Sequence, residues 1–322
     1  MKVMVTGAGA LLGQGILRSL AASPLRPTVV ALDPSPLAPG LYWTEHRALI
    51  PMAKDPAYLG AIDALLAAHR PDALMIGTDV ELLLLAQHRA ELEARHGTKI
   101  VVSSPTVVGI ADDKWLTFQF LREHGFLAPD SCLPGDEEAL IARVGFPLVV
   151  KPRVGARSIG LSVVRDRAEL ARAIASLPAP VIQECVATDQ DEYTAGTLTF
   201  DGRCEASIVM RRDLRDGNTW RAYVEAFPEL DPTVRRMAEA LGAYGPANFQ
   251  FRVDGQGVKV FEINGRFSGT TPLRMLAGFN EVDLVLRRVV LGEPVTQPPI
   301  EPMTILRYFT ELVVRPNELV TE

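Results

Sequence analysis

One stretch of the chain, residues 245–271, carries an alternating pattern that predicts a β-hairpin. Its sequence is GPANFQFRVDGQGVKVFEINGRFSGTT. Large apolar side chains alternate with polar ones on both arms, as in paired strands with one packed face. Residues 255–257, preceded by Asp254, supply the turn between the arms. The side chains expected on the packed face are Phe249, Phe251, Phe261 and Ile263.

The opposite face of this hairpin is expected to gather oxygen-bearing side chains. With that turn, Gln250 lies opposite Glu262. The same register places Asn248 opposite Asn264, and a slip of one residue would send the whole set to the other face. Carboxylate and amide oxygens beside an arginine, here Arg266, suit a hard cation such as Mg²⁺ that itself holds phosphate oxygens. A solvated sheet face with a surface glutamate is the alternative, because mixed polar faces are common on antiparallel sheets.

The remaining chain divides into further strands and helices. Strands are predicted at residues 2–6, 28–33, 73–78, 99–104 and 304–316. Over the first part of the chain strands alternate with helices, which indicates a parallel sheet whose ligands gather at the carboxyl ends of its strands. The candidate pocket residues at those ends are residues 7–13, Asp33, Thr78, Asp79 and Glu81. For Asp79 and Glu81 the alternative is a helix N-terminal charge favoured by the helix dipole.

Gly7, Gly9 and Gly13 follow the first predicted strand in the order of a dinucleotide-binding turn. A helix comes next, and then a strand that ends in Asp33, which completes the expected context of that fingerprint. An NAD-dependent oxidoreductase is therefore one alternative for this chain. Glycines at these positions also permit a tight turn and close helix packing without any dinucleotide.

A second glycine-containing loop, within residues 146–164, carries several cations. It lies between two predicted strands and includes Lys151, Arg153 and Arg157. Backbone N–H groups and cations in such a loop can cover phosphate groups. The sequence contains no GxxxxGK[ST] motif, so this is not a Walker loop. A surface hairpin tip with solubilising arginines is the alternative.

Charge and composition narrow the class of protein. The net charge of -6 argues against a nucleic-acid binder, which normally shows a basic footprint. The amino terminus lacks the apolar core of a signal peptide, and its glycine-rich centre makes a poor membrane span, so we expect a cytoplasmic protein. Lysines are scarce among the 33 basic residues. They are Lys2, Lys54, Lys99, Lys114, Lys151 and Lys259.

With these segments in this order, the sequence resembles the ATP-grasp superfamily, in particular the carbamoyl-phosphate-synthase-like branch of carboxylate-amine ligases that includes the pyrrolysine-biosynthesis ligase. The resemblance covers nearly the whole chain and rests on ADDKW, VVKPRVGARSIG, VIQECV, DEYT and EINGRFSG. It implies a mixed α/β and α+β fold with three domains. These are an N-terminal Rossmann-like pre-ATP-grasp domain at 1–104, a central subdomain with the phosphate lid loop at 105–186, and an antiparallel-sheet catalytic subdomain at 187–322.

The resemblance also implies roles for individual residues. Those implied in nucleotide binding are Lys114, Lys151, Gly155, Ser158, Glu184, Cys185, Val186 and Glu192. The implied metal ligands are Gln250, Glu262 and Asn264, and the implied catalytic cations are Lys151 and Arg266. Arg211 or Arg307 could clamp a carboxylate substrate through paired N–H groups, and a surface salt bridge is the alternative for either. Two positions depart from the family: RVGARSIG stands where a run of glycines is common, and Gly265 stands where many relatives carry proline.

The function that this resemblance implies is ATP-dependent ligation. ATP phosphorylates a small carboxylic acid, expected to be an amino acid, and an amine then attacks the acyl phosphate with loss of phosphate. The expected cofactors are ATP and Mg²⁺, with Mn²⁺ as the other choice, and the expected partners are two small-molecule substrates. No nucleic acid or membrane partner is expected, and a homodimer is allowed. The remaining alternatives are an acyl-phosphate-forming kinase, a ligase that uses ammonia, and a non-catalytic nucleotide-binding protein.

Overall fold

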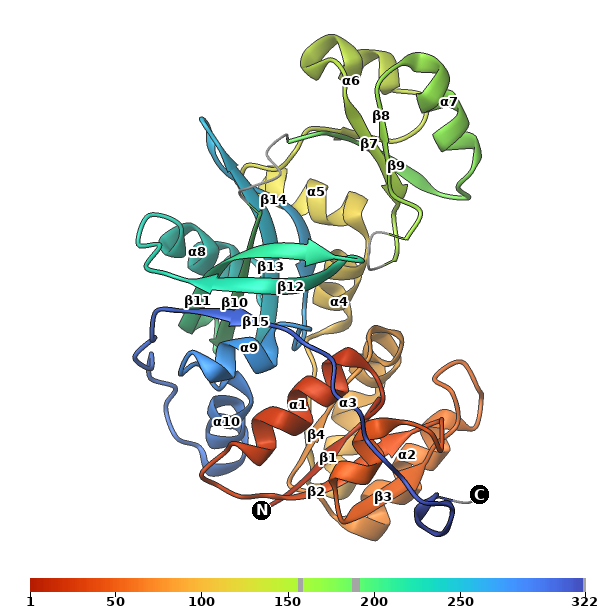
Figure 1. The fold of residues 1–322 in the computed structure, drawn as a ribbon, viewed down its shortest axis with the longest axis vertical. Coiled ribbons are helices and arrows are strands. Elements are labelled where there is room, and N and C mark those ends of the chain that lie inside the picture. Colours follow the sequence, from red (N-terminus) through yellow and green to blue (C-terminus); the bar gives the residue numbers. More distant parts are fainter. Residues whose placement is uncertain (156–158, 187–191, 321–322) are drawn as a thin grey trace.

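The computed structural model describes residues 1–155, 159–186 and 192–320 and builds them around three β-sheets (Figure 1). A five-stranded sheet lies at one end of the molecule and a four-stranded sheet at the other, with a six-stranded sheet between them. This arrangement confirms the predicted fold class, a parallel N-terminal sheet followed by antiparallel sheets. Among the described residues, no helix has the length and apolar character needed to cross a membrane.

The N-terminal sheet is parallel throughout, with the strand order β3-β2-β1-β4-β5. Its strands are β1 (Lys2–Val5), β2 (Thr28–Asp33), β3 (His46–Leu49), β4 (Ala73–Met75) and β5 (Lys99–Val101). Its helices are α1 (Leu11–Ala21), α2 (Tyr58–His69), α3 (Leu82–His96) and the 3-10 turns η1 (Pro39–Trp43) and η2 (Asp79–Glu81). Val3 and Val5 pack on the α1 side, whereas Met4 packs on the side of α2 and α3, as the period of a strand requires. The sequence did not predict β3, because HRAL is short and largely exposed at the sheet edge.

The small sheet is antiparallel, with the order β6-β9-β7-β8. Its strands are β6 (Ser131–Cys132), β7 (Leu148–Pro152), β8 (Ser162–Val164) and β9 (Pro180–Glu184). Two helices, α6 (Glu137–Val144) and α7 (Arg167–Ala175), cover one face. Leu148 and Val150 of β7 pack against these helices. Because strand side chains alternate, Lys151 faces the other way, toward the large sheet.

The large sheet is antiparallel and has the order β14-β13-β10-β11-β12-β15. Its strands are β10 (Glu192–Phe200), β11 (Arg203–Arg215), β12 (Asn218–Val224), β13 (Gly245–Asp254), β14 (Gly257–Asn264) and β15 (Met303–Leu306). The helices α4 (Pro105–Asp112), α5 (Lys114–Glu123) and α8 (Asp231–Leu241) share a core with one face. The opposite face shares a core with α1, with α9 (Thr271–Leu276) and with α10 (Glu281–Leu286), which continues as a π-helical turn at η3 (Arg287–Leu291). The division of the chain after residues 104 and 186 stays a prediction.

The last predicted strand, residues 304–316, is wrong over most of its length. Strand pairing ends at Leu306, and residues 307–315 form neither helix nor strand before the short turn η4 (Pro316–Glu318). This segment runs over the N-terminal unit, where the backbone N–H of Val320 donates to the hydroxyl of Tyr42 at 3.3 Å. Apolar residues such as Tyr308 and Phe309 suggested a strand, yet both are about four-fifths exposed, at 82% and 80%.

The hairpin of β13 and β14 has the predicted register but reaches it differently. Asp254 pairs with Gly257, so the turn holds two residues rather than the three that we expected. A bulge on β14, opposite the step from Gln250 to Phe251, adds one residue and restores the predicted pairing of Gln250 with Glu262. The extra residue is Phe261, which is only partly buried and does not join the packed face as predicted.

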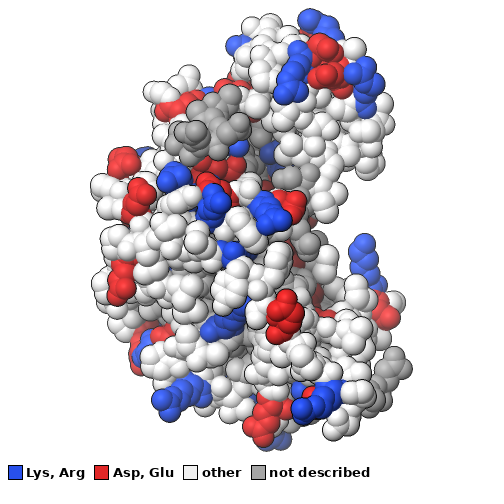
Figure 2. Space-filling model, in the orientation of Figure 1, with Lys and Arg blue, Asp and Glu red and all other residues white. Residues whose placement is uncertain are grey.

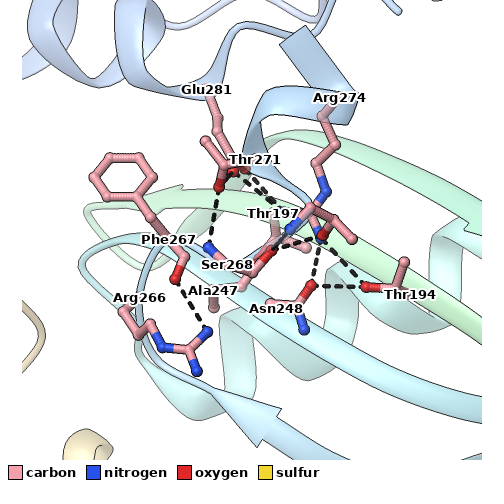
Figure 3. A network of polar contacts seen from close by, with 11 residues as sticks. Thr194, Thr197, Ala247, Asn248, Arg266, Phe267, Ser268, Thr271, Arg274 and Glu281 are labelled. Carbon is pink, nitrogen blue, oxygen red and sulfur yellow. Dashed lines mark hydrogen bonds and ion pairs between the residues drawn. The ribbon is translucent and has the colours of Figure 1, made fainter. Parts of the chain in front are cut away.

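A buried ion pair fastens α9 and α10 to the large sheet (Figure 3). Arg274 and Glu281 are each 1% exposed, and Arg274 Nη1 lies 3.1 Å from Glu281 Oε2. The guanidinium packs against β10 at Gly196, where an added Cβ atom would lie 2.4 Å from Arg274 Nη1. A glycine is therefore required here by the close approach of a charged side chain that has no room to move.

We expect Gly196→Ala to lower the free energy of unfolding by about 1–3 kcal/mol, because the methyl group overpacks the buried guanidinium. Urea denaturation of the purified variant measures this change. Gly60→Ala is the matched control, since Gly60 lies in α2 with no heavy atom within 4 Å of an added Cβ. That variant should be more stable than the wild type by up to about 1 kcal/mol. Equal stability of Gly196→Ala and the wild type would contradict the packing described here.

Candidate nucleotide and metal site

The oxygen-bearing side chains of the hairpin form one hydrogen-bonded row. Gln250 pairs with Glu262 across the strands, and Asn264 follows on the same face of β14. Gln250 Nε2 donates to Glu262 Oε1 at 3.1 Å, and Asn264 Nδ2 donates to the same oxygen at 3.1 Å. We call Gln250, Glu262 and Asn264 the oxygen row. Within the described part of the chain, the second carboxylate oxygen of Glu262 accepts no hydrogen bond.

An arginine bonds each end of the oxygen row. Arg212 Nη2 donates to Gln250 Oε1 at 2.5 Å, and Arg266 Nη2 donates to Asn264 Oδ1 at 2.8 Å. The carboxylate of Glu262 therefore lies in the middle of the row, with one amide on each side of it and one arginine beyond each amide. Figure 2 shows acidic and basic side chains gathered where the small-sheet lobe meets the large sheet, beside a hollow between that lobe and the N-terminal one.

The donor set of the oxygen row fits a hard divalent cation. One carboxylate and two amide oxygens are oxygen ligands of the kind that Mg²⁺ prefers, and Glu262 has an oxygen to spare. The described residues hold no cluster of three His, Cys, Asp or Glu side chains, so a cation at this hairpin would depend on the amide oxygens. Gln250 and Asn264 would then have to exchange an arginine bond for the metal bond.

The placement of Arg211 corrects one expectation. Arg211 pairs with Tyr193 and Tyr223, on the face opposite to the oxygen row, and its guanidinium lies 4.0 Å from the centre of the Tyr223 ring. The next residue, Arg212, faces the oxygen row instead. Sequence reasoning could not separate the two, because the parity of a strand residue follows from its pairing partner, and that pairing was not known.

Arg212 belongs to a buried charge cluster with Glu192. Arg212 Nη2 lies 2.6 Å from Glu192 Oε1, and Arg252 Nη2 lies 3.0 Å from Glu192 Oε2. Glu192 is 8% exposed, so its charge is balanced by two guanidinium groups rather than by water. Glu192, one of the residues predicted to bind the nucleotide, is thus next to the oxygen row, and both its carboxylate oxygens accept from arginines.

Lys151 is the buried cation that faces the oxygen row from the small sheet. Its side chain is 6% exposed, and Nζ donates to Gln183 Oε1 at 2.8 Å and to the carbonyl of Phe261 at 3.4 Å. Burial lowers the pKa of Lys151 to about 8, and the nearby Glu262 carboxylate opposes that shift. The structure thus brings Lys151 to the hairpin, on the face that carries the oxygen row.

Lys114 and the start of the lid loop are held together. Lys114 Nζ donates to the carbonyl of Gly155 at 2.7 Å. Asp113, which caps α5 through the N–H of Trp115, also forms a bidentate ion pair with Arg153. Arg153 therefore holds the start of the loop against α5 rather than pointing into a phosphate site. The sequence did not predict this pairing with Asp113. The predicted Ser158 and the loop residue Arg157 lie outside the described residues.

Three of the predicted nucleotide-binding residues, Glu184, Cys185 and Val186, lie at the end of β9 and directly after it. Glu184 Oε1 accepts from Lys259 Nζ at 2.9 Å, and Glu184 Oε2 accepts from the backbone N–H of Asp130 at 3.0 Å. The carboxylate is therefore occupied, and Lys259 is a contributor that the sequence reasoning did not place. Cys185 is partly buried, and the carbonyl of Val186 accepts from Arg252 at 3.0 Å. Glu184 and Lys259 line a groove of about 550 Å³.

The carboxyl ends of the N-terminal strands reach the hairpin through one ion pair. Asp79 Oδ1 accepts from Arg266 Nε at 2.6 Å, so the guanidinium of Arg266 bridges Asp79 and Asn264. Glu81, in contrast, is 3% exposed and accepts from the hydroxyls of Thr78 and Tyr58, both at 2.6 Å. Burial raises the pKa of Glu81. Asp79 is thus part of the site, whereas Glu81 and Thr78 hold the sheet together.

The N-terminal glycines are packing positions. An added Cβ on Gly13 would lie 2.0 Å from the carbonyl oxygen of Gly7, and one on Gly9 would lie 2.7 Å from Ala38 Cβ. Asp33 Oδ2 accepts from the backbone N–H of Gly9 at 2.7 Å. The chain itself therefore fills the space over the second glycine, where a pyrophosphate would approach in a dinucleotide-binding turn. This geometry favours the packing interpretation over an NAD site.

Asn248 was expected on the polar face but is drawn into the network around Arg274 (Figure 3). It is 1% exposed, and its Oδ1 accepts from Arg274 Nη2 and, at 2.8 Å, from the hydroxyl of Thr194. Its oxygen is thus not available to a cation beside Asn264. The sequence did not predict that Arg274 is buried. A buried arginine cannot be told from a surface arginine in the sequence until its partner, here Glu281, is known.

Two family models match separate parts of the chain. Residues 181–312 match "ATP-grasp in the biosynthetic pathway with Ter operon", and residues 15–101 match "PylC-like, N-terminal domain". Among curated relatives, the chain is 28% identical to a formate-dependent phosphoribosylglycinamide formyltransferase from Anaeromyxobacter dehalogenans, over 93% of this chain and 79% of that protein. It is 27% identical to the carbamoyl phosphate synthase large chain of Thermus thermophilus over 55% of this chain, which is only 19% of that protein.

Solved structures share the fold at low sequence identity. N5-carboxyaminoimidazole synthetase from Staphylococcus aureus, complexed with ADP, superposes with a TM-score of 0.73 at 15% identity and covers 93% of this chain and 79% of that chain. The L-amino acid ligase from Bacillus licheniformis gives 0.71 at 19% identity and covers 92% of this chain and 75% of that chain. Together with the order of the three sheets, these findings confirm the resemblance seen in the sequence. The chain has the ATP-grasp fold, with an ATP-grasp domain matched at residues 181–312 and a PylC-like N-terminal domain matched at residues 15–101.

Proposed function

We propose that this protein is an ATP-dependent carboxylate-amine ligase that activates a small carboxylic acid, an amino acid, as an acyl phosphate and couples it to an amine. ADP and phosphate are released. The observation that carries this proposal is the oxygen row, flanked by Arg212 and Arg266 and faced by the buried Lys151. The likeness to an ADP-bound synthetase supports ATP as the phosphoryl donor, and the likeness to an L-amino acid ligase supports an amino acid as a substrate.

The nucleotide is assigned to the space between the small sheet and the large sheet. Lys151 and Lys114 come from the central segment, and the hinge of Glu184, Cys185 and Val186 ends β9 nearby. Glu192 stands at the start of β10 with its arginine partners. We assign Lys151 and Lys114 to phosphate oxygens and Glu192 to the ribose. Gly155 and Ser158 are assigned to the lid over the phosphates.

The charge arrangement suits phosphoryl transfer to a carboxylate. A carboxylate oxygen attacks the γ-phosphorus while the bond to the ADP oxygen breaks, so negative charge passes from the attacking group to the leaving group. Lys151 and Arg266 would stabilise the equatorial phosphoryl oxygens, because at neutral pH both carry positive charge beside the oxygen row. In the second step the amine nitrogen attacks the acyl carbon, inorganic phosphate leaves, and the amine gives up one proton. This chain needs no covalent intermediate of its own.

Glu262, with Gln250 and Asn264, would hold a divalent cation, Mg²⁺ or Mn²⁺. Such a cation would supply charge neutralisation between the β- and γ-phosphate oxygens. The protein's part is to keep the three oxygens on one face, which the bulge at Phe261 secures. Arg212 and Arg266 hold the amide groups in place from both sides.

We expect Glu262→Gln to abolish the effect of Mg²⁺ on ADP binding. In the wild type, Mg²⁺ should tighten ADP binding by about tenfold or more, because a cation held by Glu262 would neutralise charge on the phosphates. Isothermal titration calorimetry with ADP, with and without Mg²⁺, measures the effect. Glu138→Gln is the matched control, since Glu138 forms only an exposed pair with Arg167 on the surface. An undiminished Mg²⁺ effect in Glu262→Gln would overturn the metal assignment.

The lowered pKa of Lys151 predicts a pH dependence of nucleotide affinity. The ammonium group is charged below about pH 8 and loses its proton above it. We therefore expect the affinity for ADP to fall by up to about tenfold between pH 7 and pH 9 as an attractive charge is lost. Lys151→Arg should flatten this profile, because a guanidinium stays charged over that range, and Lys151→Met should bind weakly at every pH. A wild-type profile that is flat to pH 9 would remove Lys151 from the phosphate site.

A further inference from the structure

Two arginines from distant parts of the chain approach one loop, residues 268–272, directly after the phosphate cation Arg266. Arg18 lies on α1 of the N-terminal unit, and Arg307 follows β15. In the described parts of the chain, neither arginine forms an ion pair with an acidic side chain. Within the described residues, these two cations therefore have no acidic counter-charge.

The packing of α1 places Arg18 at this loop. An added Cβ on Gly269 would lie 2.8 Å from Leu11, and one on Gly15 would lie 2.9 Å from Pro272. Residues 11, 15 and 18 are spaced by four and three, so they lie on one face of a helix. Arg18 therefore continues the face of α1 that packs against residues 268–272. Its guanidinium stacks 5.3 Å from the centre of the Trp43 ring, which restrains an otherwise exposed side chain.

Arg307 reaches the same loop from the other side. Its Nη2 donates to the carbonyl of Gly269, and its backbone N–H donates to the carbonyl of Trp220 at 3.1 Å. The side chain is partly buried, and burial together with the charge of Arg18 lowers the pKa of Arg307 to about 10. The two guanidinium groups thus repel each other across the loop. Like charges held together in a partly buried place are unfavourable unless an anion joins them.

We propose that Arg18 and Arg307 together bind a second oxyanion group of the acid substrate, so that this acid carries two anionic groups. This inference rests on the proposed ligase function and narrows its substrate class. One carboxylate is placed near Arg266 for phosphorylation, and the other group, a carboxylate or a phosphate, lies between Arg18 and Arg307. Guanidinium groups match both kinds of oxyanion with paired N–H donors.

The length of the loop limits the size of that acid. Only two residues, Phe267 and Ser268, separate Arg266 from Gly269, whose carbonyl Arg307 contacts. An extended chain spans at most about 3.6 Å per residue, so the two Cα atoms lie within about 11 Å of each other. This close spacing along the chain favours a short acid with its two anionic groups a few carbon atoms apart.

The separate binding of three small acids tests this inference without any measurement of activity. The probes are glutarate, 3-phosphonopropionate and butyrate, titrated by calorimetry into the full chain with ADP and Mg²⁺ at constant ionic strength. We expect glutarate or 3-phosphonopropionate to bind about tenfold or more tightly than butyrate, because only these acids reach the arginine pair. Tighter binding of glutarate assigns the pair to a carboxylate, and tighter binding of 3-phosphonopropionate assigns it to a phosphate.

Variants separate this site from general charge effects. Arg18→Gln and Arg307→Gln should each remove the preference over butyrate and leave butyrate binding unchanged. Arg18 is exposed, so its variant keeps the test valid if Arg307→Gln does not fold. Arg172→Gln is the matched control, because Arg172 is exposed on α7 at the far end of the molecule, and it should keep the preference.

Two results would overturn the inference: equal binding of all three acids by the wild type, or a full preference in Arg18→Gln. The proposed ligase function is checked separately by ADP release from ATP with candidate acids and amines. A binding preference without ADP release would leave the arginine site standing and count against the ligase. ADP release with monocarboxylates, without any preference for a second anionic group, would support the ligase function and count against the arginine site.

Discussion

The cross-strand register of β13 with β14 decides which side chains can reach the candidate site. A two-residue turn alone would bring Gln250 opposite Phe261 and turn Glu262 toward the apolar core. The bulge restores the pairing of Gln250 with Glu262 and leaves Phe261 out of the packed face. The same change brings the Phe261 carbonyl within reach of Lys151, at 3.4 Å. One extra residue in a strand thus joins the carboxylate of the large sheet to the cation of the small sheet.

The oxygen row gains its order from charges outside the hairpin. Arg212 is fixed by Glu192 of β10, and Arg266 is fixed by Asp79 of the N-terminal unit. Each arginine thus bonds one acidic side chain and one amide of the oxygen row. Burying such charges without partners would cost several kcal/mol each, so the paired arrangement is what permits cations to stand beside a site that also holds Lys151. Preorganised donors of this kind need little rearrangement when a phosphate develops charge.

The sequence predicted the elements better than the contacts between them. Strand alternation found the hairpin and the register of its polar face, and the spacing of strands and helices found the parallel sheet, since both are local patterns. The edge strand β3 was missed and β15 was predicted to extend too far, because segments such as residues 46–49 and 307–315 carry weak or misleading apolar patterns. Arg211 was predicted at the site and Arg212 was not, because strand parity depends on a distant partner. The buried pair of Arg274 and Glu281 had no local signal, since two charged residues on neighbouring helices are ordinarily exposed.

The guanidinium of Arg266 ties the N-terminal unit to the oxygen row. Its Nε bonds Asp79 and its Nη2 bonds Asn264, and the group is planar, so both bonds persist only while those two residues keep their relative positions. The loop that follows Arg266 is held in turn by α1, through Leu11, and by the buried pair of Arg274 and Glu281. A shift of α1 would therefore displace this loop and, with it, Arg266 a few residues earlier in the chain. The position of the N-terminal unit is thus part of the geometry of the site, through the bond of Asp79 to Arg266.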